Sequence, residues 1–332
     1  MIVKSSPSAK YEIVYEMVNQ DGNLMNVKQL CEIAGVSRSG YYAWLKAEPT
    51  RLERETRDRA DFAEILKAYK YRGYDKGGRG IHMRLLRHEP GVLMNLKKIY
   101  RLMRKYGLKC PIRKANPYRR MMNALKTNST APNILNREFK AHGVRAALLT
   151  DISYLKRTDG GFSYLSAIMD AGSKEILAHV VSSSLEIDFV LETVEQLITK
   201  HGGELKTDAL LHSDQGSHYT SHKFIELLKN KELRQSMSRR ANCWDNAPQE
   251  SFFGHMKEEI DLSHCTTHDG IAAVIDDWIN YYNNDRYQWD LAKLSPREYY
   301  EYTITGVYPL SFPPFDCATD CGAAHEQNID TS

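Results

Sequence analysis

The chain has 332 residues, 42% of them hydrophobic and 26% charged, an ordinary composition for a soluble protein that buries a core. It contains no run of about 18 apolar residues, and its polar first ten residues lack the apolar segment of a secretory signal. The six cysteines are scattered and do not resemble a disulfide framework. We therefore expect a cytoplasmic protein without a membrane span, with about two domains.

The net charge of +3 conceals two regions of opposite sign. Residues 1–145 contain 30 lysines and arginines against 13 acidic residues, whereas the remainder contains 15 against 29. Between Lys67 and Arg120 there are 17 basic residues and two acidic ones. A solvated helix face normally mixes both signs, so this density favours a polyanionic partner. The acidic half would repel such a partner unless its carboxylates hold cations.

The first predicted elements form a helix-turn-helix-like N-terminal region, residues 1–60. Residues 25–48 have the pattern of two short helices separated by Gly35, with Ser37 as a candidate N-cap of the second helix. This arrangement would bring Arg38, Tyr41 and Tyr42 to DNA. A plain helical hairpin explains the pattern equally well, and both interpretations stay open.

A basic helical DNA-binding domain is predicted over residues 61–115. Residues 51–70 resemble a charged helix, and two further helices lie on either side of Pro90, the second ending at Gly107. Their polar faces carry the candidate DNA-binding residues Arg79, Lys97, Lys98, Arg101, Arg104 and Lys105. Residues 116–140 are predicted to be an extended linker that can follow a phosphate backbone, since residues 111–136 are rich in Pro, Asn, Arg and Thr.

From residue 146 the pattern changes to α/β. Three successive strands with tight turns predict an antiparallel meander, followed by an alternation of helix and strand that ends in a helix near Pro248. This order is that of a ribonuclease H-like core, a mixed five-stranded sheet with flanking helices. We assign the core to residues 141–305 and a C-terminal tail to residues 306–332.

Three carboxylates occupy informative places in this core. Asp151 interrupts an apolar strand, where a charge is costly unless it is paired or ligates a cation. Asp214 ends the next buried strand, and Glu250 lies one turn inside the helix near Pro248, with 35 residues between these two. Each acid alone is more simply structural, but all three at the expected elements of one fold indicate a catalytic and metal-binding site.

Carboxylates suit one class of reaction in particular. Phosphodiester cleavage needs an activated oxygen nucleophile and a stabilised leaving 3′ oxygen, which two Mg²⁺ ions about 4 Å apart can provide. Mg²⁺ prefers hard oxygen ligands and keeps several waters, so a few carboxylates and a substrate phosphate suffice. We therefore expect Asp151, Asp214 and Glu250 to bind two Mg²⁺ ions, for which Mn²⁺ can substitute.

At this point a family resemblance emerges. The region from about Leu148 to Tyr300 resembles the catalytic core of retroviral integrases and, more closely, the OrfB transposases of the bacterial IS-three insertion-sequence family. The matching motifs are LLTDISYL, HSDQGSHYTS, NCWDNAPQESFFGHMKEE and YYNNDRYQWDLAKLSPREYY. Upstream, YRGYDKGGRGIHMRLLR and IYRLMRKYGL are similar to the helical domain that precedes the core in this family. The resemblance spans about residues 25–305.

The resemblance implies a transposase of the DDE type, which cleaves the ends of an insertion element with water and joins the 3′ hydroxyl to DNA. Lys257, seven residues after Glu250, matches the basic residue of the D-D-35-E-K pattern and is expected to contact DNA. Implied partners are double-stranded DNA (the terminal repeats and the target), further copies of the chain on DNA, and the upstream-frame OrfA protein. The chain lacks a leucine heptad, and its residues after Pro314 match no family motif.

Two alternative functions stay open. A ribonuclease H-like nuclease acting on RNA–DNA hybrids would share the core, but the 35-residue spacing, Lys257 and the basic upstream region argue against it. A catalytically inert DNA-binding regulator would use residues 25–48, but the intact acid triad argues against that. His218 and His222 have metal-ligand spacing without a partner cysteine pair, so a zinc site is not favoured.

Overall fold

The computed structural model describes most of the chain, namely residues 6–73, 76–87, 91–110, 142–238 and 246–310. The predicted linker and the part of the predicted tail beyond residue 310 lie outside the described residues. The chain divides into two compact units, one formed by residues 1–67 and 101–107, the other by residues 68–100 and 108–332. Each unit is described by itself below.

The first unit begins with three short helices, α1 (Pro7–Val18), α2 (Val27–Ala34) and α3 (Arg38–Lys46). The predicted helix pair is confirmed, because an Asn26–Gln29 capping box starts α2 and Ser37 caps α3. Gly35 ends α2 in the left-handed conformation at φ +64°, which a residue with a Cβ rarely adopts. The helices enclose a small core formed by Val14, Leu30, Cys31 and Tyr41.

Two helices, the long α4 (Glu48–Lys70) and the shorter α6 (Leu96–Lys105), have residues in both units. The charged helix predicted at residues 51–70 is confirmed as α4. Gly107 follows α6 with φ +71°, which confirms the predicted end of that helix. Within the second unit, α5 (Gly78–Leu85) buries Ile81 and Leu85.

The second unit contains a mixed five-stranded sheet, as predicted. Strands β1, β2 and β3 form an antiparallel meander, and β4 and β5 are parallel to β1, giving the order β3-β2-β1-β4-β5. Parallel neighbours need a crossover, which helices α8 and α9 provide. The bounds are β1 Ala147–Lys156, β2 Phe162–Asp170, β3 Ile176–Ser182, α8 Asp188–His201, β4 Leu210–Ser213, α9 His222–Asn230 and β5 Arg234–Met237.

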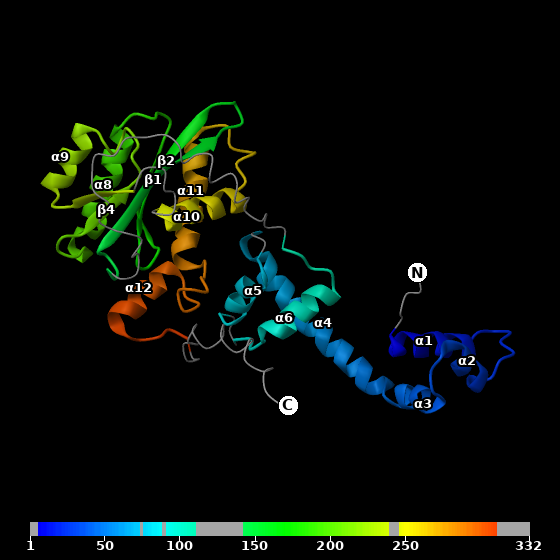
Figure 1. Ribbon diagram of the computed structural model, residues 1–332. Coiled ribbons are helices and arrows are strands. Elements are labelled where there is room, and N and C mark those ends of the chain that lie inside the picture. The colour runs from blue at the N-terminus through cyan, green and yellow to red at the C-terminus, as the bar shows by residue number, and fades with distance from the viewer. Residues whose placement is uncertain (1–5, 74–75, 88–90, 111–141, 239–245, 311–332) are drawn as a thin grey trace, which may run out of the picture. The chain divides into compact units, whose positions relative to one another are not determined.

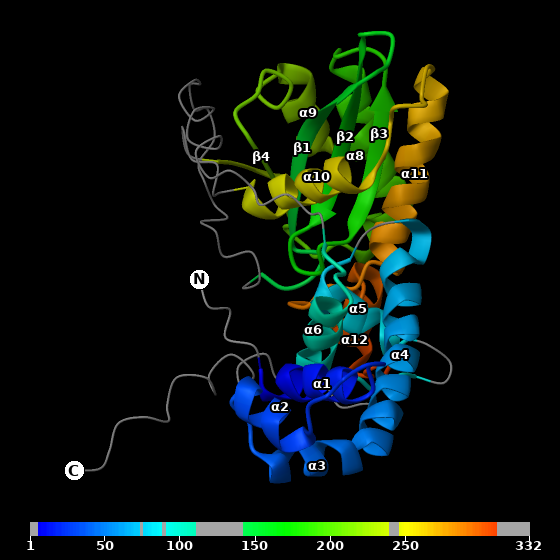
Figure 2. The same ribbon diagram turned by 90° about the vertical axis from the view of Figure 1, so that its right-hand side faces the viewer.

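Helices cover both faces of this sheet (Figures 1 and 2). On one face, α10 (Ala247–Glu259) and α11 (His268–Asn284) pack through Phe252 and Trp278 against alternate residues of β1 and β2. On the other face, α8 and α9 pack against the intervening residues. Burial on both faces explains why the strands are nearly continuous apolar runs, and why Asp151 stands out in β1. A further helix, α12, spans Pro296–Thr305.

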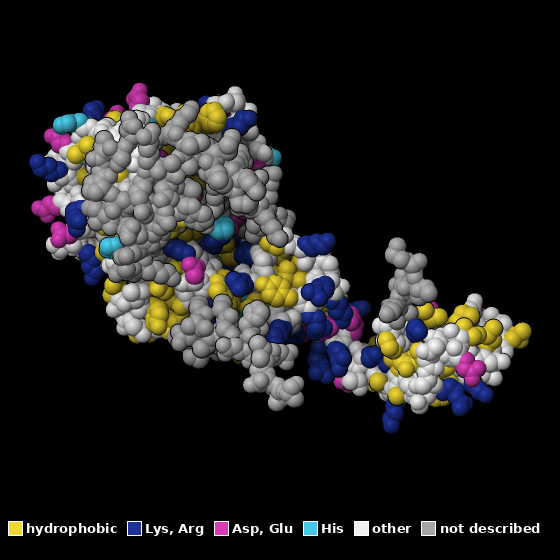
Figure 3. Space-filling view, viewed as in Figure 1, with side chains coloured by type: hydrophobic (Ala, Val, Ile, Leu, Met, Phe, Trp, Pro, Cys, Tyr) yellow, Lys and Arg dark blue, Asp and Glu magenta, His cyan; other side chains and the backbone are white. Residues whose placement is uncertain are grey.

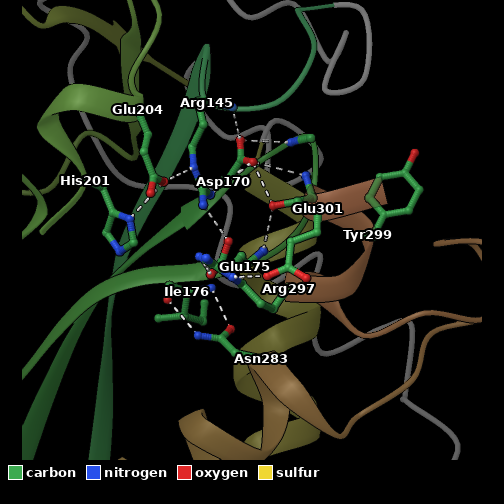
Figure 4. Close-up of polar contacts among 12 residues, drawn as sticks. Arg145, Asp170, Glu175, Ile176, His201, Glu204, Asn283, Arg297, Tyr299 and Glu301 are labelled. Carbon is green, nitrogen blue, oxygen red and sulfur yellow. Dashed lines mark hydrogen bonds and ion pairs between the residues drawn. The ribbon is translucent and has the colours of Figure 1, made fainter. Parts of the chain in front are cut away.

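A buried ionic network holds the start of β1 (Figure 4). The Arg145 side chain is 1% exposed and pairs with Glu175 at 2.6 Å and with Glu204 at 3.1 Å. Its guanidinium stacks 3.8 Å from the ring centroid of Tyr300 on α12, and its backbone N–H donates to Asp170. The network therefore joins the strand that carries Asp151 to the β2–β3 turn and to α12.

Candidate active site

Asp151 and Asp214 project from adjacent parallel strands. In the register of β1 and β4, Leu149 pairs with His212, and each aspartate lies two residues further along the chain. The two carboxylates therefore leave the sheet at the same level. Asp151 lies within the continuous strand β1, and Asp214 directly follows Ser213, the last residue of β4.

Glu250 is carried by the first turn of α10, whose Pro248 lies at the helix start. Phe252, Phe253 and Met256 anchor this helix in the core beneath the sheet. Glu250 and Lys257 are seven residues apart, close to two helical turns, so both leave the same side of α10. The helix therefore presents one acid and one base towards the edge where the aspartates lie.

The three carboxylates and Lys257 influence one another electrostatically. Burial, followed by the negative charges of Asp214 and Glu250, raises the pKa of Asp151 to about 8, while the Ile152 N–H and the positive charge of Lys257 oppose this rise. Burial of its carboxyl also raises the pKa of Asp214, although the residue as a whole is exposed. Burial lowers the pKa of Lys257, and the Asp151 charge opposes that shift. Opposed shifts in one place are typical of functional sites.

Backbone N–H groups orient one oxygen of each aspartate. The Ile152 N–H donates to Asp151 Oδ1 at 2.8 Å, and the Gly216 N–H donates to Asp214 Oδ1 at 2.8 Å. A Cβ on Gly216 would lie 2.9 Å from that same Asp214 oxygen, so a larger residue would displace the carboxylate. Glycine at position 216 therefore leaves the Asp214 carboxylate in the orientation that accepts this hydrogen bond.

The donor chemistry of this site fits a hard divalent cation. Asp151, Asp214 and Glu250 supply only carboxylate oxygens, the ligand type that Mg²⁺ prefers. Within the described ranges, no three His, Cys, Asp or Glu side chains converge closely enough to hold an ion. The carboxylates raise the Asp151 pKa by repulsion, and a cation between them would relieve this repulsion.

The raised pKa of Asp151 predicts a dependence of stability on pH. Between the ordinary pKa of 3.8 and about 8, the folded chain keeps a proton that the unfolded chain has released. The free energy of unfolding therefore falls as pH rises through this range. In EDTA, urea denaturation of Asp151→Asn between pH 5 and pH 8 should show a shallower decline than the wild type.

Asp159→Asn serves as the control, since a hydrogen bond from Arg157 lowers the pKa of Asp159 and this acid is ionised in both states above pH 5. Its variant should keep the wild-type decline. An equal decline in Asp151→Asn and the wild type would contradict the burial of the Asp151 charge.

The structure corrects one predicted DNA contact in the first unit. Tyr41 is only 2% exposed and lies in the small core, where its ring stacks on Trp44. It cannot offer its ring to a groove of DNA. Arg38 is exposed at the start of α3, and Tyr42, one position further along the helix than Tyr41, is 56% exposed. These two residues keep the placement that the helix-turn-helix prediction requires.

The candidates on α6 divide into two groups. Arg101 and Lys105 form ion pairs with Asp58, at 2.6 and 2.7 Å, and their hydrogen bonds hold the pKa of Asp58 well below its usual range. Their charges are therefore partly neutralised by α4, and Figure 3 shows acidic side chains beside the basic ones there. Lys97 and Arg104 are exposed, and Lys98 is half-buried. Arg79, also exposed, lies over the Trp289 ring at 5.1 Å.

The remaining arginines of α5 and its flank contact the core. Arg84 stacks 3.4 Å from the Tyr71 ring centroid, and Arg87 lies 4.3 Å from that of Tyr287 and pairs with Glu298 of α12. These guanidiniums bind α5 to the C-terminal helices of the second unit. Part of the positive charge in the predicted DNA-binding domain is thus structural.

Three buried polar residues lie around the carboxylates and were not among the predicted site residues, namely Asn246, Gln249 and Tyr219. Tyr219 is 1% exposed, its hydroxyl lies 3.5 Å from Thr150 Oγ1, and burial together with Asp151 and Asp214 raises its pKa well above 10. Asn246 directly precedes α10, but its side chain makes no capping hydrogen bond to the helix. All three lie inside the sequence motifs around Asp214 and Glu250, and this position could have marked them as candidate site residues.

Comparisons with known proteins identify the family. The Integrase core domain model matches residues 141–243, a second integrase core model matches residues 250–304, and an HTH-like domain model matches residues 56–116. The chain is 30% identical, over 86% of its length and 96% of the relative, to the putative transposase InsK for insertion sequence element IS150 of Escherichia coli. The chain belongs to the IS-three family of insertion-sequence transposases. Transposase InsF for IS3A of the same organism is 27% identical, over 86% of this transposase and 97% of the relative.

Solved structures give more distant likenesses to this transposase. The simian T-cell lymphotropic virus intasome contains a chain with TM-score 0.43 and 11% identity, covering 66% of the transposase and 72% of that chain. The BIV integrase catalytic core has TM-score 0.36 and 17% identity, covering 48% and 96% respectively. The strand order and the integrase-core match, not these likenesses, identify the ribonuclease H-like fold. In the part of the chain that the structure describes, no helix is long and apolar enough to cross a membrane.

Proposed function

We propose that this transposase cleaves and joins DNA at insertion-sequence ends through Asp151, Asp214 and Glu250, which hold two Mg²⁺ ions or, in their place, Mn²⁺. The observation that carries the proposal is the placement of the three acids, with Asp151 in β1, Asp214 directly after the parallel strand β4 and Glu250 in the first turn of α10. The charges of both other acids also contribute to the raised pKa of Asp151. Three acids from β1, the end of β4 and α10 are thus close enough to interact, beside one lysine. The match to an integrase core and to an insertion-sequence transposase supports double-stranded DNA as the substrate.

The proposed chemistry has two steps. In cleavage, the oxygen of water bonds to phosphorus and the bond to the 3′ oxygen breaks, leaving a 3′ hydroxyl and a 5′ phosphate. In joining, that 3′ hydroxyl attacks a target phosphodiester, whose own 3′ oxygen leaves. Bound Mg²⁺ would supply Lewis acidity for both the attacking and the leaving oxygen. The three carboxylates would hold the ions. Water and the 3′ hydroxyl are the nucleophiles, so the reaction needs none from the protein. The hydroxyls nearest the site are otherwise engaged, because Tyr219 is buried and the Ser213 hydroxyl donates to the Asp214 carbonyl.

The proposal is tested by incubating the purified full chain with duplex DNA carrying the element ends, and with an RNA–DNA hybrid of the same sequence. Nicking at the end of the element that requires Mg²⁺ supports the proposal. Cleavage of the hybrid alone would favour the ribonuclease H-like alternative. Binding of the duplex without cleavage of either substrate would favour the inert regulator. Association with further copies and with OrfA stays a prediction.

Lys257 is proposed to contact the DNA phosphate beside the scissile bond. A lysine is a point charge that needs no fixed geometry to bind a phosphate, and this one lies near Asp151 on the face of α10 that carries Glu250. Lys257→Ala should weaken end binding and strand joining by about 1–3 kcal/mol, and Lys257→Arg should restore part of the loss. Lys200→Ala, an exposed lysine on α8 across the sheet, should bind end DNA normally. Equal joining rates in all these variants would show that Lys257 does not contact the DNA.

The exposed α6 residues are proposed to bind phosphates without regard to sequence. Each such contact adds about 0.9 to the slope of log affinity against log salt concentration, so Lys97→Ala with Arg104→Ala should reduce the slope by about 1.8. Arg101→Ala with Lys105→Ala should change the slope less and destabilise the chain more, because Asp58 then loses both partners. Binding of a random duplex at several salt concentrations measures both. A slope that falls in the Arg101→Ala, Lys105→Ala variant and not in the Lys97→Ala, Arg104→Ala variant would contradict the assignment of the phosphate contacts to Lys97 and Arg104.

A further inference from the structure

Two side chains at the start of α10 donate hydrogen bonds to the backbone around Asp151. Asn246 Nδ2 donates to the Thr150 carbonyl at 3.4 Å, and Thr150 is the residue immediately before Asp151. Gln249 Nε2 donates to the Ala167 carbonyl at 3.3 Å, and Ala167 is the β2 residue paired with Asp151 in the ladder. The segment that leads into Glu250 is therefore attached to both strands around Asp151.

Both amides are almost completely buried, Asn246 at 5% and Gln249 at 0% exposure. Their carbonyl oxygens, Asn246 Oδ1 and Gln249 Oε1, are buried and have no hydrogen-bond partner in the described part of the chain. A buried acceptor without a partner is destabilising, and an apolar side chain of similar size would avoid that cost. Stability alone therefore does not explain amides at these two positions.

Asn246 also forgoes the role that its position favours. Asparagine before the first helical residue normally accepts a hydrogen bond from the helix N-terminus, which stabilises the helix. Here Asn246 has φ −126° and ψ 26°, and its side chain makes no capping hydrogen bond. Its amide is directed to β1 instead, so the local arrangement favours attachment to the strand over capping of α10.

We infer that Asn246 and Gln249 are positioning residues, which fix the distance and direction from Glu250 to Asp151 by attaching the first turn of α10 to β1 and β2. The inference rests on the proposed function of the carboxylates. Gln249 directly precedes Glu250, so a shift of the first turn would move the Glu250 carboxylate relative to the strands. Metal affinity should then fall, whereas DNA affinity, which depends on other residues, should not.

Gln249→Met tests this, because methionine keeps the length of the side chain and removes the donor. The concentration of Mg²⁺ that gives half of the metal-induced rise in unfolding temperature should increase about 10–100-fold, as for other residues that orient metal ligands. The Mg²⁺ requirement for end cleavage should increase in parallel. Affinity for end DNA in EDTA should remain as in the wild type. If Gln249→Met does not fold, Asn246→Ala, which removes the other donor, is measured in the same way with the same expectation.

Gln196→Met is the matched control, since Gln196 also makes long hydrogen bonds, at 3.5 and 3.4 Å, but on the surface of α8. Its metal titration should equal that of the wild type. A Gln249→Met titration equal to that of Gln196→Met would overturn the inference. If Gln249→Met has no effect, Glu250→Gln shows which proposal has failed. The proposed function fails if Glu250→Gln also leaves the metal titration and cleavage unchanged. Only the positioning role fails if Glu250→Gln abolishes both.

Discussion

Replacing Glu250 with glutamine should lower the rate of strand cleavage by about a thousandfold or more, while the chain stays folded. Glutamine keeps the shape of the side chain and removes the negative charge that would ligate a cation. Without metal, the variant should be as stable as the wild type or more so, because repulsion with Asp151 is relieved. Nicking of labelled end DNA and thermal unfolding in EDTA measure the two effects.

Glu258→Gln is the control for this substitution. Glu258 is exposed on the same helix, eight residues after Glu250, and the same change of charge there should leave cleavage within about twofold of the wild type. Wild-type nicking by Glu250→Gln would remove Glu250 from the site. Equal losses in both variants would point to a general effect of charge on DNA binding.

Arg145→Met should cost about 3–5 kcal/mol of the free energy of unfolding, the second large effect that we expect. Removal of the guanidinium leaves Asp170, which is 0% exposed, as a buried carboxyl without its cation. It also removes the 2.6 Å ion pair of Glu175, which is 4% exposed. Equilibrium denaturation at pH 7 measures the loss. Arg297→Met is the control: Arg297 also pairs with Glu175, at 3.4 Å, but is 38% exposed, so its loss should cost less than about 1 kcal/mol. Similar losses in the two variants would contradict a central role for Arg145.

The sheet and its crossovers could be predicted because their signals are local. The β1 and β4 segments are apolar runs bounded by polar residues. In the structure, Ser221 caps the start of α9. Among the α-helices of the described residues, α1 and α12 were not predicted. In α1 only Val14 is buried, so its apolar periodicity is weak. The start of α12 carries a capping box formed by Ser295 and Glu298, a signal that the sequence contained.

Non-local contacts account for most of what the sequence could not reveal about side chains. Tyr41 and Tyr42 are adjacent and chemically equal, and only the packing of α1 against α3 determines which one is buried. The pairing of Arg101 and Lys105 with Asp58 joins residues more than 40 positions apart, so the basic face of α6 looked uniformly available in the sequence. The attachment of Asn246 and Gln249 to β1 and β2 is likewise tertiary.

The most direct test of the central claim replaces Mg²⁺ with Fe²⁺ in the full chain and generates hydroxyl radicals with ascorbate and peroxide. Radicals formed at the bound ion cut the nearest peptide bonds, so the fragments report which segments surround the metal. The account predicts cuts near residues 151, 214 and 250 together, suppressed by excess Mg²⁺ and lost in Asp151→Asn. Fragments without ends near 151 and 250, or an unchanged pattern in Asp151→Asn, would contradict a metal site formed by the three carboxylates.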